Sequence, residues 1–276
     1  MKFDVIVGNP PYQETTGATT GKSLWPKFVD TSINIIKELG YVALIHPSGW
    51  RSGKTTAKKI HNTIQAYQMC HLVLSNYEKG QKLFNVMTTC DWYILQKTPA
   101  AHGTTIIDCD NNLHELFLGN VKQLPDVLIP DYQHIIDITM EDTIEILFNY
   151  INDTQKEHIQ KYQDDVYKFP VIYTLKKAGP SYVWSSRNDL GHYNIPKVIL
   201  GRGLGMPILD LNGDYSMCEF SYAIVGKDIK YLQNVYNALI TERCINDLKK
   251  LGCGKGHNYL REVVRLLRPE FYKNYI

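Results

Sequence analysis

The stretch FDVIVGNPPYQ (residues 3–13) joins a short apolar run to a corner of one asparagine, two prolines and a tyrosine. The run from Phe3 to Val7 has no helical period, which predicts a fully buried strand of a parallel sheet. In open α/β sheets, ligands bind beyond the carboxyl ends of the strands. Because Asn9 follows this strand directly, the stretch predicts a binding corner at a sheet edge.

The residues of this corner suit an exocyclic amino group. The Asn9 carbonyl can accept from it. The Pro10 carbonyl is a restrained second acceptor, since Pro11 has no competing N–H. Two such acceptors would leave the nitrogen lone pair free to attack a methyl donor, and Tyr12 would stack on a base flipped out of a duplex. The alternative is a Pro-Pro turn with Tyr12 covering the core; the β-α-β context favours the binding corner.

The hydrophobic pattern of residues 1–100 predicts a partial Rossmann-like α/β sheet, mostly parallel, in the order β-α-β-α-β-β. Strands are expected at 41–46, 71–75 and 86–95, helices from 25 to 39 with Gly40 as C-cap and from 57 to 67, and loops at 14–23 and 76–84.

After about residue 100 the pattern becomes mixed α+β. It predicts a helix at 141–151, short strands within 170–225, and basic amphipathic helices at 231–248 and 259–267. We therefore predict a domain boundary near residue 100, with one domain over residues 1–100 and a second region over 101–276.

Composition narrows the class of protein. The 276 residues are 44% apolar, and no run approaches the ~18 apolar residues of a membrane span. With no signal-peptide pattern at the N-terminus, we expect a cytoplasmic protein that makes no membrane contact. The cysteines form no Cys-x-x-Cys pair, so we expect neither a metal site nor a disulfide framework; they are Cys70, Cys90, Cys109, Cys218, Cys244 and Cys253.

Charge is divided unevenly along the chain. Residues 108–165 hold 13 acidic and 3 basic residues, which leaves 27 basic and 15 acidic residues elsewhere. The flanking regions would meet a polyanion, while the acidic middle would face solvent or shape a groove. We predict DNA-phosphate contacts at an acid-free cluster, at one loop lysine and in a glycine-rich loop; solvated side chains are the alternative. These residues are Arg51, Lys54, Lys58 and Lys59, then Lys22, then Arg202.

Residues 3–13 resemble motif IV of the S-adenosylmethionine-dependent DNA adenine-N6 methyltransferases, especially the Asn-Pro-Pro-Tyr group of Eco57I-like modification methylases. GYVALIHPSGW (40–50) is similar to the family's next strand and loop, and LFNVMTTCDWYILQK (83–97) resembles motif VIII. The resemblance implies that Asn9 and Pro10 bind the amino group, while Tyr12 and Phe84 sandwich the flipped adenine. For Phe84 a plain core position is the alternative.

Residues 196–215 and 231–244 are similar in pattern to the target-recognition regions of the same enzymes. The resemblance thus implies a catalytic domain over residues 1–100 and a DNA-binding region, like a target-recognition domain, over 101–276.

Family members place the S-adenosylmethionine pocket before motif IV. A permuted pocket at Gly201, Gly203 and Gly205 is rejected because strand and turn residues follow, not a helix. Three explanations stay open: a second polypeptide supplies the donor half, the reading frame is a truncated relic, or the chain only binds DNA. An exposed edge of the first strand would favour a partner.

The strongest rival motif is TGATTGKS (16–23), a near match to a phosphate-binding loop. It has Thr16 where glycine is needed and lies too far after the strand. We therefore predict a site-specific DNA adenine-N6 methyltransferase of a restriction-modification system that uses S-adenosylmethionine, with a non-catalytic DNA-binding subunit as the alternative. The sequence leaves open whether adenine or cytosine N4 is methylated, in DNA or in RNA.

Overall fold

A computed structural model describes residues 2–14, 21–52, 58–85, 88–176, 178–203, 205–226, 228–252 and 259–276. The chain divides into two compact units. Unit 1 comprises Met1–Leu128 and Ile138–Met140, and unit 2 comprises Ile129–Asp137 and Glu141–Ile276. The division lies later than the boundary predicted near residue 100, because two strands beyond that residue extend the sheet of unit 1.

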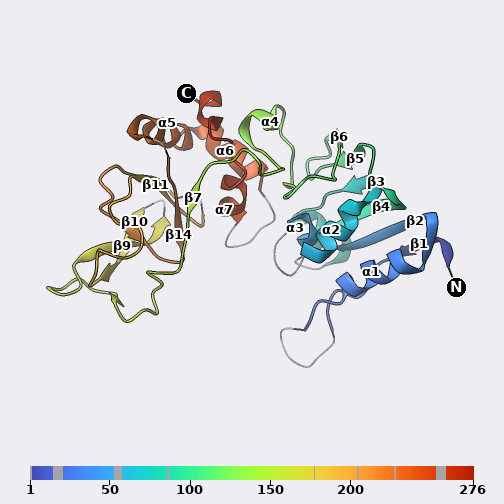
Figure 1. Cartoon of the computed structure of the whole chain (residues 1–276), viewed down its shortest axis with the longest axis horizontal. Coiled ribbons are helices and arrows are strands. Elements are labelled where there is room, and N and C mark those ends of the chain that lie inside the picture. Colours follow the sequence, from blue (N-terminus) through green and yellow to red (C-terminus); the bar gives the residue numbers. More distant parts are fainter. Residues whose placement is uncertain are drawn as a thin grey trace. The chain divides into compact units, whose positions relative to one another are not determined.

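Unit 1 is built on a six-stranded sheet in the order β1-β2-β4-β3-β5-β6 (Figure 1). Its strands are β1 (Phe3–Gly8), β2 (Ile36–Pro47), β3 (Tyr67–Val73), β4 (Cys90–Pro99), β5 (Thr104–Ile107) and β6 (Leu113–Leu116). β1 pairs parallel to β2, and β3 pairs parallel to β5. β4 pairs antiparallel to both β2 and β3, and β6 pairs antiparallel to β5. Two of the five strand pairs are parallel and three are antiparallel, so the sheet is mixed and the predicted, mostly parallel arrangement is not confirmed. β4 lies between β2 and β3.

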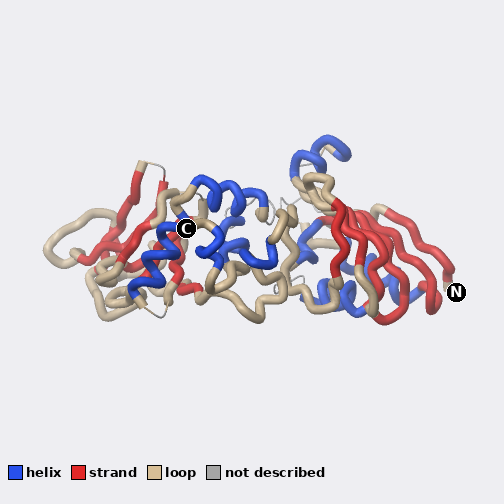
Figure 2. Tube along the Cα trace, turned by 90° about the horizontal axis from the view of Figure 1, so that it is seen from above, coloured by secondary structure: helices blue, strands red, loops and turns tan. Residues whose placement is uncertain are grey.

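Helices cover this sheet. α1 (Trp25–Ile35) packs on β2, α2 (Lys58–Ala66) packs on β3, and the two helices contact each other (Figures 1 and 2). Their buried faces carry apolar residues at helical spacing, such as Val29 and Ile33 in α1 and Ile60 and Ile64 in α2. A short 3-10 helix, η1 (Ser48–Arg51), follows β2. The layered α/β arrangement of this unit agrees with the prediction from its hydrophobic pattern.

β1 is an edge strand, and the prediction that it is fully buried is wrong. It pairs only with β2 among the described strands. Phe3 is 39% exposed, Val5 57% and Val7 76%. An apolar strand with one unpaired edge is a ready template for pairing with another strand. β1 is therefore an apolar strand with one edge that no described strand pairs with.

Two local predictions in unit 1 are also wrong. The first helix ends at Ile35, not near Gly40, because Ile36 already pairs with Phe3 in the sheet. A side chain at Gly40 would lie 2.9 Å from the Asp4 backbone oxygen, so glycine is needed there for the close approach of β1. Residues 76–84, predicted as a loop, contain α3 (Tyr77–Phe84), in which the Asn76 side chain accepts from the Lys79 N–H at 3.0 Å.

Unit 2 contains two four-stranded sheets, in the orders β13-β9-β10-β8 and β12-β11-β14-β7. The first comprises β8 (Ile159–Gln160), β9 (Phe169–Lys176), β10 (Gly179–Ser185) and β13 (Ser216–Met217). The second comprises β7 (Ile146–Leu147), β11 (Lys197–Gly201), β12 (Ile208–Asp210) and β14 (Ser221–Ile224). The short strands predicted for 170–225 are thus confirmed. The helix predicted at 141–151 is wrong, because β7 pairs with β14 in that segment.

The helices of unit 2 lie mainly at its C-terminal end. They are α4 (Tyr132–Ile135), α5 (Ile229–Leu239), α6 (Glu242–Lys250), α7 (Tyr259–Val264) and the 3-10 helix η2 (Phe271–Asn274) (Figure 2). The single basic helix predicted at 231–248 is divided in two, since Thr241 caps α6 by accepting from the Cys244 N–H at 3.2 Å. Unit 2 is therefore a mixed α+β body, as predicted.

Candidate functional site

The corner lies at the carboxyl end of β1. Gly8, the last residue of the strand, is in register with Leu44 of β2. Pro10 is buried, whereas Asn9 and Pro11 are exposed. The Asn9 amide is thus presented to solvent beyond the end of a parallel strand, where ligands of open α/β sheets bind.

Tyr12 links the corner to the start of β4. Its hydroxyl oxygen accepts a hydrogen bond from the Cys90 thiol at 3.4 Å, and its carbonyl accepts from the Leu24 N–H at 2.9 Å. Burial, followed by the hydrogen bond with Cys90, raises the pKa of the Tyr12 phenol well above its usual range. Tyr12 therefore stays neutral at physiological pH, and its half-buried ring is held in place at both ends.

The loop after β2 forms a second wall of this region. Pro47 is in register with Cys90 of β4, so the loop begins beside the residue that contacts Tyr12. The Ser48 N–H donates to the Thr89 carbonyl at 3.0 Å, and the two side-chain hydroxyls are hydrogen-bonded as well. Residues from the ends of β1 and β2 and from the start of β4 thus meet at one edge of the sheet.

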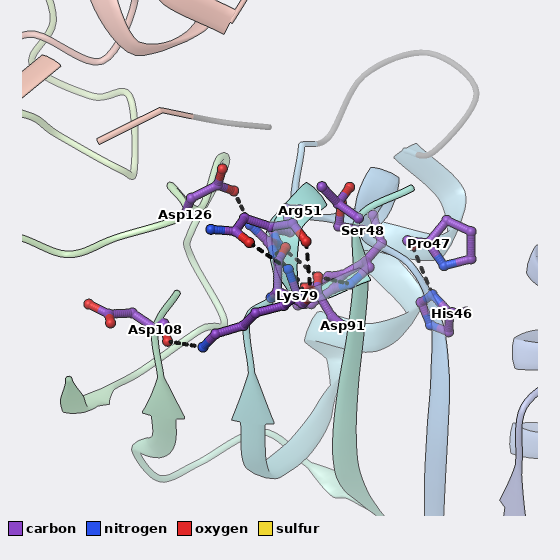
Figure 3. Close-up of polar contacts among 12 residues, drawn as sticks. His46, Pro47, Ser48, Arg51, Lys79, Asp91, Asp108 and Asp126 are labelled. Carbon is purple, nitrogen blue, oxygen red and sulfur yellow. Dashed lines mark hydrogen bonds and ion pairs between the residues drawn. The ribbon is translucent and has the colours of Figure 1, made fainter. Parts of the chain in front are cut away.

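His46 lies beneath this edge and is fully buried. Its ring stacks on Trp25 with a centroid separation of 4.4 Å. Its Nε2 lies 3.1 Å from the Tyr93 hydroxyl. Its Nδ1 lies 3.0 Å from the Pro47 carbonyl (Figure 3). Burial lowers the pKa of His46 to about 4, against the opposing effects of Pro47 and Asp91. A neutral histidine therefore supports the Pro47 loop.

Arg51 does not lie on the surface, so the prediction that it contacts DNA phosphate is wrong. Its Nε donates to Asp91 Oδ2 at 2.7 Å, and its Nη2 donates to the Ser75 carbonyl at 2.9 Å. Nη2 also pairs with the Asp91 carboxylate, and Nη1 pairs with the Asp126 carboxylate (Figure 3). Burial opposes its charge, but Asp91 outweighs this effect and raises the pKa of the guanidinium. These partners occupy its donors, which are then unavailable to phosphate.

Asp91 is the centre of this network. It is fully buried on β4 and also accepts from the Trp50 indole N–H at 3.0 Å and from the Ser75 N–H at 3.2 Å. The network joins the loop after β2 to the end of β3 and to β4. It therefore fixes the geometry of the sheet edge that carries the corner.

Some acidic side chains of residues 108–165 form contacts inside unit 1, which the prediction of a segment that faces solvent or shapes a groove did not include. Asp126 pairs with Arg51. Asp108 is buried and accepts from His114, at 2.9 Å, and from backbone N–H groups. Burial raises the pKa of Asp108, but hydrogen bonds from His114 and Asn112 outweigh it and hold that pKa below its usual value. The uneven charge of this segment thus contributes to the folded interior.

The other predicted residues have varied positions. Lys22 is exposed, and its carbonyl accepts from the Glu14 N–H at 2.9 Å. Lys58 is exposed at the start of α2. Lys54 and the side chain of Phe84 lie outside the described set, so the pairing of Phe84 with Tyr12 stays a prediction. Arg202 belongs to unit 2, where its guanidinium lies 4.6 Å from the centre of the Phe220 ring.

Sequence reasoning missed Cys90, Trp25 and Thr89 as supports of the corner. Trp25 was recognised as a helix residue but not as the stacking partner of His46. Cys90 was considered only as a possible metal ligand or disulfide partner, yet its thiol donates to the Tyr12 hydroxyl oxygen. The only available signal was that Thr89 and Cys90 begin the strand that resembles motif VIII.

The described residues do not fit a complete S-adenosylmethionine pocket. Adenosine-binding sites of α/β proteins use a glycine-rich turn between a strand and a helix N-terminus. Within residues 2–14, 21–52 and 58–85, β1 is followed by the proline corner, β2 by η1, and β3 by the Asn76 cap of α3, and none of these described stretches contains that turn. Gly201 and Gly205 approach Leu175 of β9, so these two glycines serve packing within unit 2, whereas a side chain at Gly203 would meet nothing within 4 Å.

Comparison with known proteins supports the resemblance. Residues 1–84 match the model of the Eco57I restriction-modification methylase family. Over 54 residues the chain is 43% identical to an uncharacterized adenine-specific methylase of Mycoplasma pneumoniae. That alignment covers 18% of this chain and 12% of the relative. The resemblance predicted from the Asn-Pro-Pro-Tyr corner is thus confirmed for the first part of the chain.

Solved structures with some likeness are also restriction-modification proteins. The type IIL enzyme MmeI, solved in complex with DNA, has a TM-score of 0.49 and 6% identity over 85% of this chain and 42% of its own. The M protein of the type I restriction enzyme EcoKI has a TM-score of 0.31 and 11% identity over 39% of this chain and 25% of its own. Both TM-scores are below 0.5 and carry no weight for the fold. No described helix is long and apolar enough to cross a membrane.

Proposed function

We propose that this chain is the base-binding and target-recognition part of a DNA adenine-N6 methyltransferase of a restriction-modification system. The observation that carries the proposal is the position of the Asn-Pro-Pro-Tyr corner. The corner follows β1 directly and leaves the Asn9 amide exposed, while Tyr12 is held against Cys90 of β4. The match of residues 1–84 to restriction-modification methylases supports the same reaction class.

In this proposal the corner orients and polarises the amino group of a flipped adenine. The Asn9 side-chain oxygen and the Pro10 carbonyl accept hydrogen bonds from the two N–H groups of this amino nitrogen. This arrangement directs the nitrogen lone pair away from the ring plane. The buried position of Pro10 keeps this part of the corner rigid. The ring of Tyr12 supports one face of the base, and Phe84 is proposed for the other face.

S-adenosylmethionine is the proposed methyl donor. Because the described residues do not fit its pocket, we assign none of them to it. We propose that another polypeptide segment, from a second chain or a longer form of this one, pairs with the open edge of β1 and supplies the pocket. The exposed apolar residues Phe3, Val5 and Val7 support such a neighbour.

Asn9→Ala tests the role of the corner. The chain is expressed with its neighbouring reading frames in a host without adenine methylation, and N6-methyladenine in the DNA is measured by mass spectrometry. We expect at least a 100-fold loss with the variant, the size of effect seen when one oriented hydrogen-bonding group is removed from a reacting centre. DNA binding should stay unchanged, since Asn9 is exposed and contributes no packing.

Asn62→Ala is the matched control, because Asn62 is an exposed asparagine in α2 of the same unit. It should methylate as well as the wild type. Normal methylation by Asn9→Ala would disprove the assignment, and N4-methylcytosine in place of N6-methyladenine would redirect it to cytosine.

A non-catalytic DNA-binding subunit is the second candidate. It is favoured by the missing glycine-rich turn among the described connections. Calorimetric titration with S-adenosylmethionine separates the two functions. If the chain is part of a methyltransferase, S-adenosylmethionine should bind to the chain or to its complex with a partner. A non-catalytic DNA-binding subunit requires no such binding.

A further inference from the structure

Three arginines of unit 2 come together from two separate parts of the chain. Arg202 follows β11, whereas Arg261 lies in α7 and Arg265 follows one turn later. The Arg265 N–H donates to the Arg261 carbonyl at 3.1 Å, so the two residues share one face of the helical turn. We call Arg202, Arg261 and Arg265 the arginine cluster.

Aromatic rings fix two of these guanidinium groups. The Arg202 guanidinium lies 4.6 Å from the centre of the Phe220 ring, and the Arg202 backbone N–H donates to the Phe220 carbonyl at 3.2 Å. Arg261 lies 4.3 Å from the centre of the Phe148 ring. The strand β14 lies between β11 and β7, and therefore brings the segments that carry these rings to neighbouring positions. Stacked guanidinium planes are pre-oriented for ligand binding.

The charges of the cluster are only partly balanced. Burial, and then the positive charges of Arg202 and Arg265, lower the pKa of the Arg261 guanidinium, against an opposing effect of Tyr150. The Glu262 carboxylate lies 3.7 Å from Arg261 and 3.9 Å from Arg265. In the described part of the chain, Glu262 is the one carboxylate that forms an ion pair with these guanidinium groups, which leaves an excess of positive charge in a partly buried place.

Arg202 keeps an unused donor. One terminal nitrogen donates to the Glu219 carbonyl at 2.8 Å. Its Nε is buried and has no hydrogen-bond partner in the described part of the chain. A buried donor without a partner costs free energy that an incoming acceptor would recover.

We propose that the arginine cluster binds a phosphate of the DNA backbone, an inference that rests on the proposed action of this chain on DNA. Guanidinium groups match phosphate oxygens with paired hydrogen bonds, and such contacts set the position of a protein along a duplex. The Tyr150 ring, 57% exposed and 5.1 Å from Phe148, borders the cluster and can contact the adjoining sugar. An acidic peptide is the competing occupant.

The test measures DNA affinity of the full chain by fluorescence anisotropy with a labelled 30-base-pair duplex at a series of salt concentrations. The variant combines Arg202→Gln, Arg261→Gln and Arg265→Gln. We expect at least a tenfold loss of affinity at low salt, and a decrease of roughly 2 to 3 in the slope of log affinity against log salt. The control, Lys249→Gln, Lys250→Gln and Lys273→Gln, removes the same charge from exposed positions and should change the slope by less than about 1.

Two further variants keep the test valid if the triple variant does not fold. Tyr150→Ser and Arg265→Gln alter exposed or half-exposed side chains, and each should weaken DNA binding several-fold. An unchanged salt slope in every variant overturns the proposal. So does a loss of polyglutamate binding with DNA binding intact, which would identify an acidic peptide as the occupant.

The readout is independent of methyl transfer. If the wild-type chain does not methylate DNA but the triple variant has a reduced salt slope, the phosphate site is supported and the proposed methyltransferase function is contradicted. If the wild-type chain methylates DNA but the triple variant has an unchanged salt slope, the methyltransferase function is supported and the phosphate site is contradicted.

Discussion

Arg51 shows how one buried side chain can be mistaken for a surface contact. Its neighbours in sequence are basic and contain no acid, which is typical of a phosphate-binding loop. Its actual partners, Asp91 and Asp126, lie 40 and 75 residues away. No local pattern reports such distant pairing. By contrast, the Asn9 corner was predictable because all its residues are adjacent in sequence.

Arg51→Gln should strongly destabilise unit 1. The substitution leaves the Asp91 carboxylate buried without its cation, and breaking a buried pair in this way costs about 3–5 kcal/mol. The free energy of unfolding, measured in urea, checks the value. Lys59→Gln removes a surface ion pair with Asp30 and should cost less than about 1 kcal/mol. Equal effects from the two substitutions would contradict the described network.

The low pKa of His46 should make the free energy of unfolding of unit 1 decrease in acid. Its pKa is about 4 in the folded protein, below the ordinary value of 6.5, so between these pH values the unfolded chain binds a proton that the folded chain excludes. The stabilisation is complete above pH 6.5 and is lost as the pH falls toward 4, by about 3 kcal/mol in total.

His46→Gln removes this proton uptake. The stability difference between wild type and variant should therefore shrink as the pH is lowered from 7 to 4, as measured by urea unfolding at each pH. A constant difference would show that His46 does not titrate in this way.

At the scale of elements, periodicity located most strands but not their ends. β2 and β3 lie where their apolar runs were found, yet β2 begins at Ile36, inside the predicted helix, because it pairs with β1 there. Residues 141–151 have the composition of a helix but form β7 through pairing with β14. Tertiary pairing thus overrides local preference where the apolar pattern suits both structures.

Asn76→Ala should destabilise α3 by about 1 kcal/mol, because it removes the side-chain acceptor for the Lys79 N–H. Chemical denaturation followed by circular dichroism measures the change. Asn62→Ala, inside α2, removes no cap and should be neutral or slightly stabilising. A neutral Asn76→Ala would show that other contacts hold the start of α3.

At the scale of the whole molecule, the sheet of unit 1 ends in two different edges. β1 presents a row of exposed apolar side chains, whereas the opposite edge strand, β6, is short. The composition of residues 3–7 could not reveal this difference, since a buried strand and an apolar strand with a missing neighbour have the same sequence pattern.

The β1 edge should promote association of the isolated chain. Val5→Lys with Val7→Lys should reduce self-association in sedimentation experiments several-fold, since charged edge residues oppose strand pairing. Leu113→Lys, on β6, alters an equally exposed residue and should have a smaller effect. If Leu113→Lys is just as effective, the β1 edge is not the associating surface.

The position of β4 between β2 and β3 also sets the order of events during synthesis on the ribosome. β2 and β3 leave the exit tunnel before β4, yet they do not pair with each other. Until Pro99 has emerged, β2 has β1 as its one available neighbour in the sheet and β3 has none, so the nascent chain exposes unpaired strand edges to which chaperones can bind.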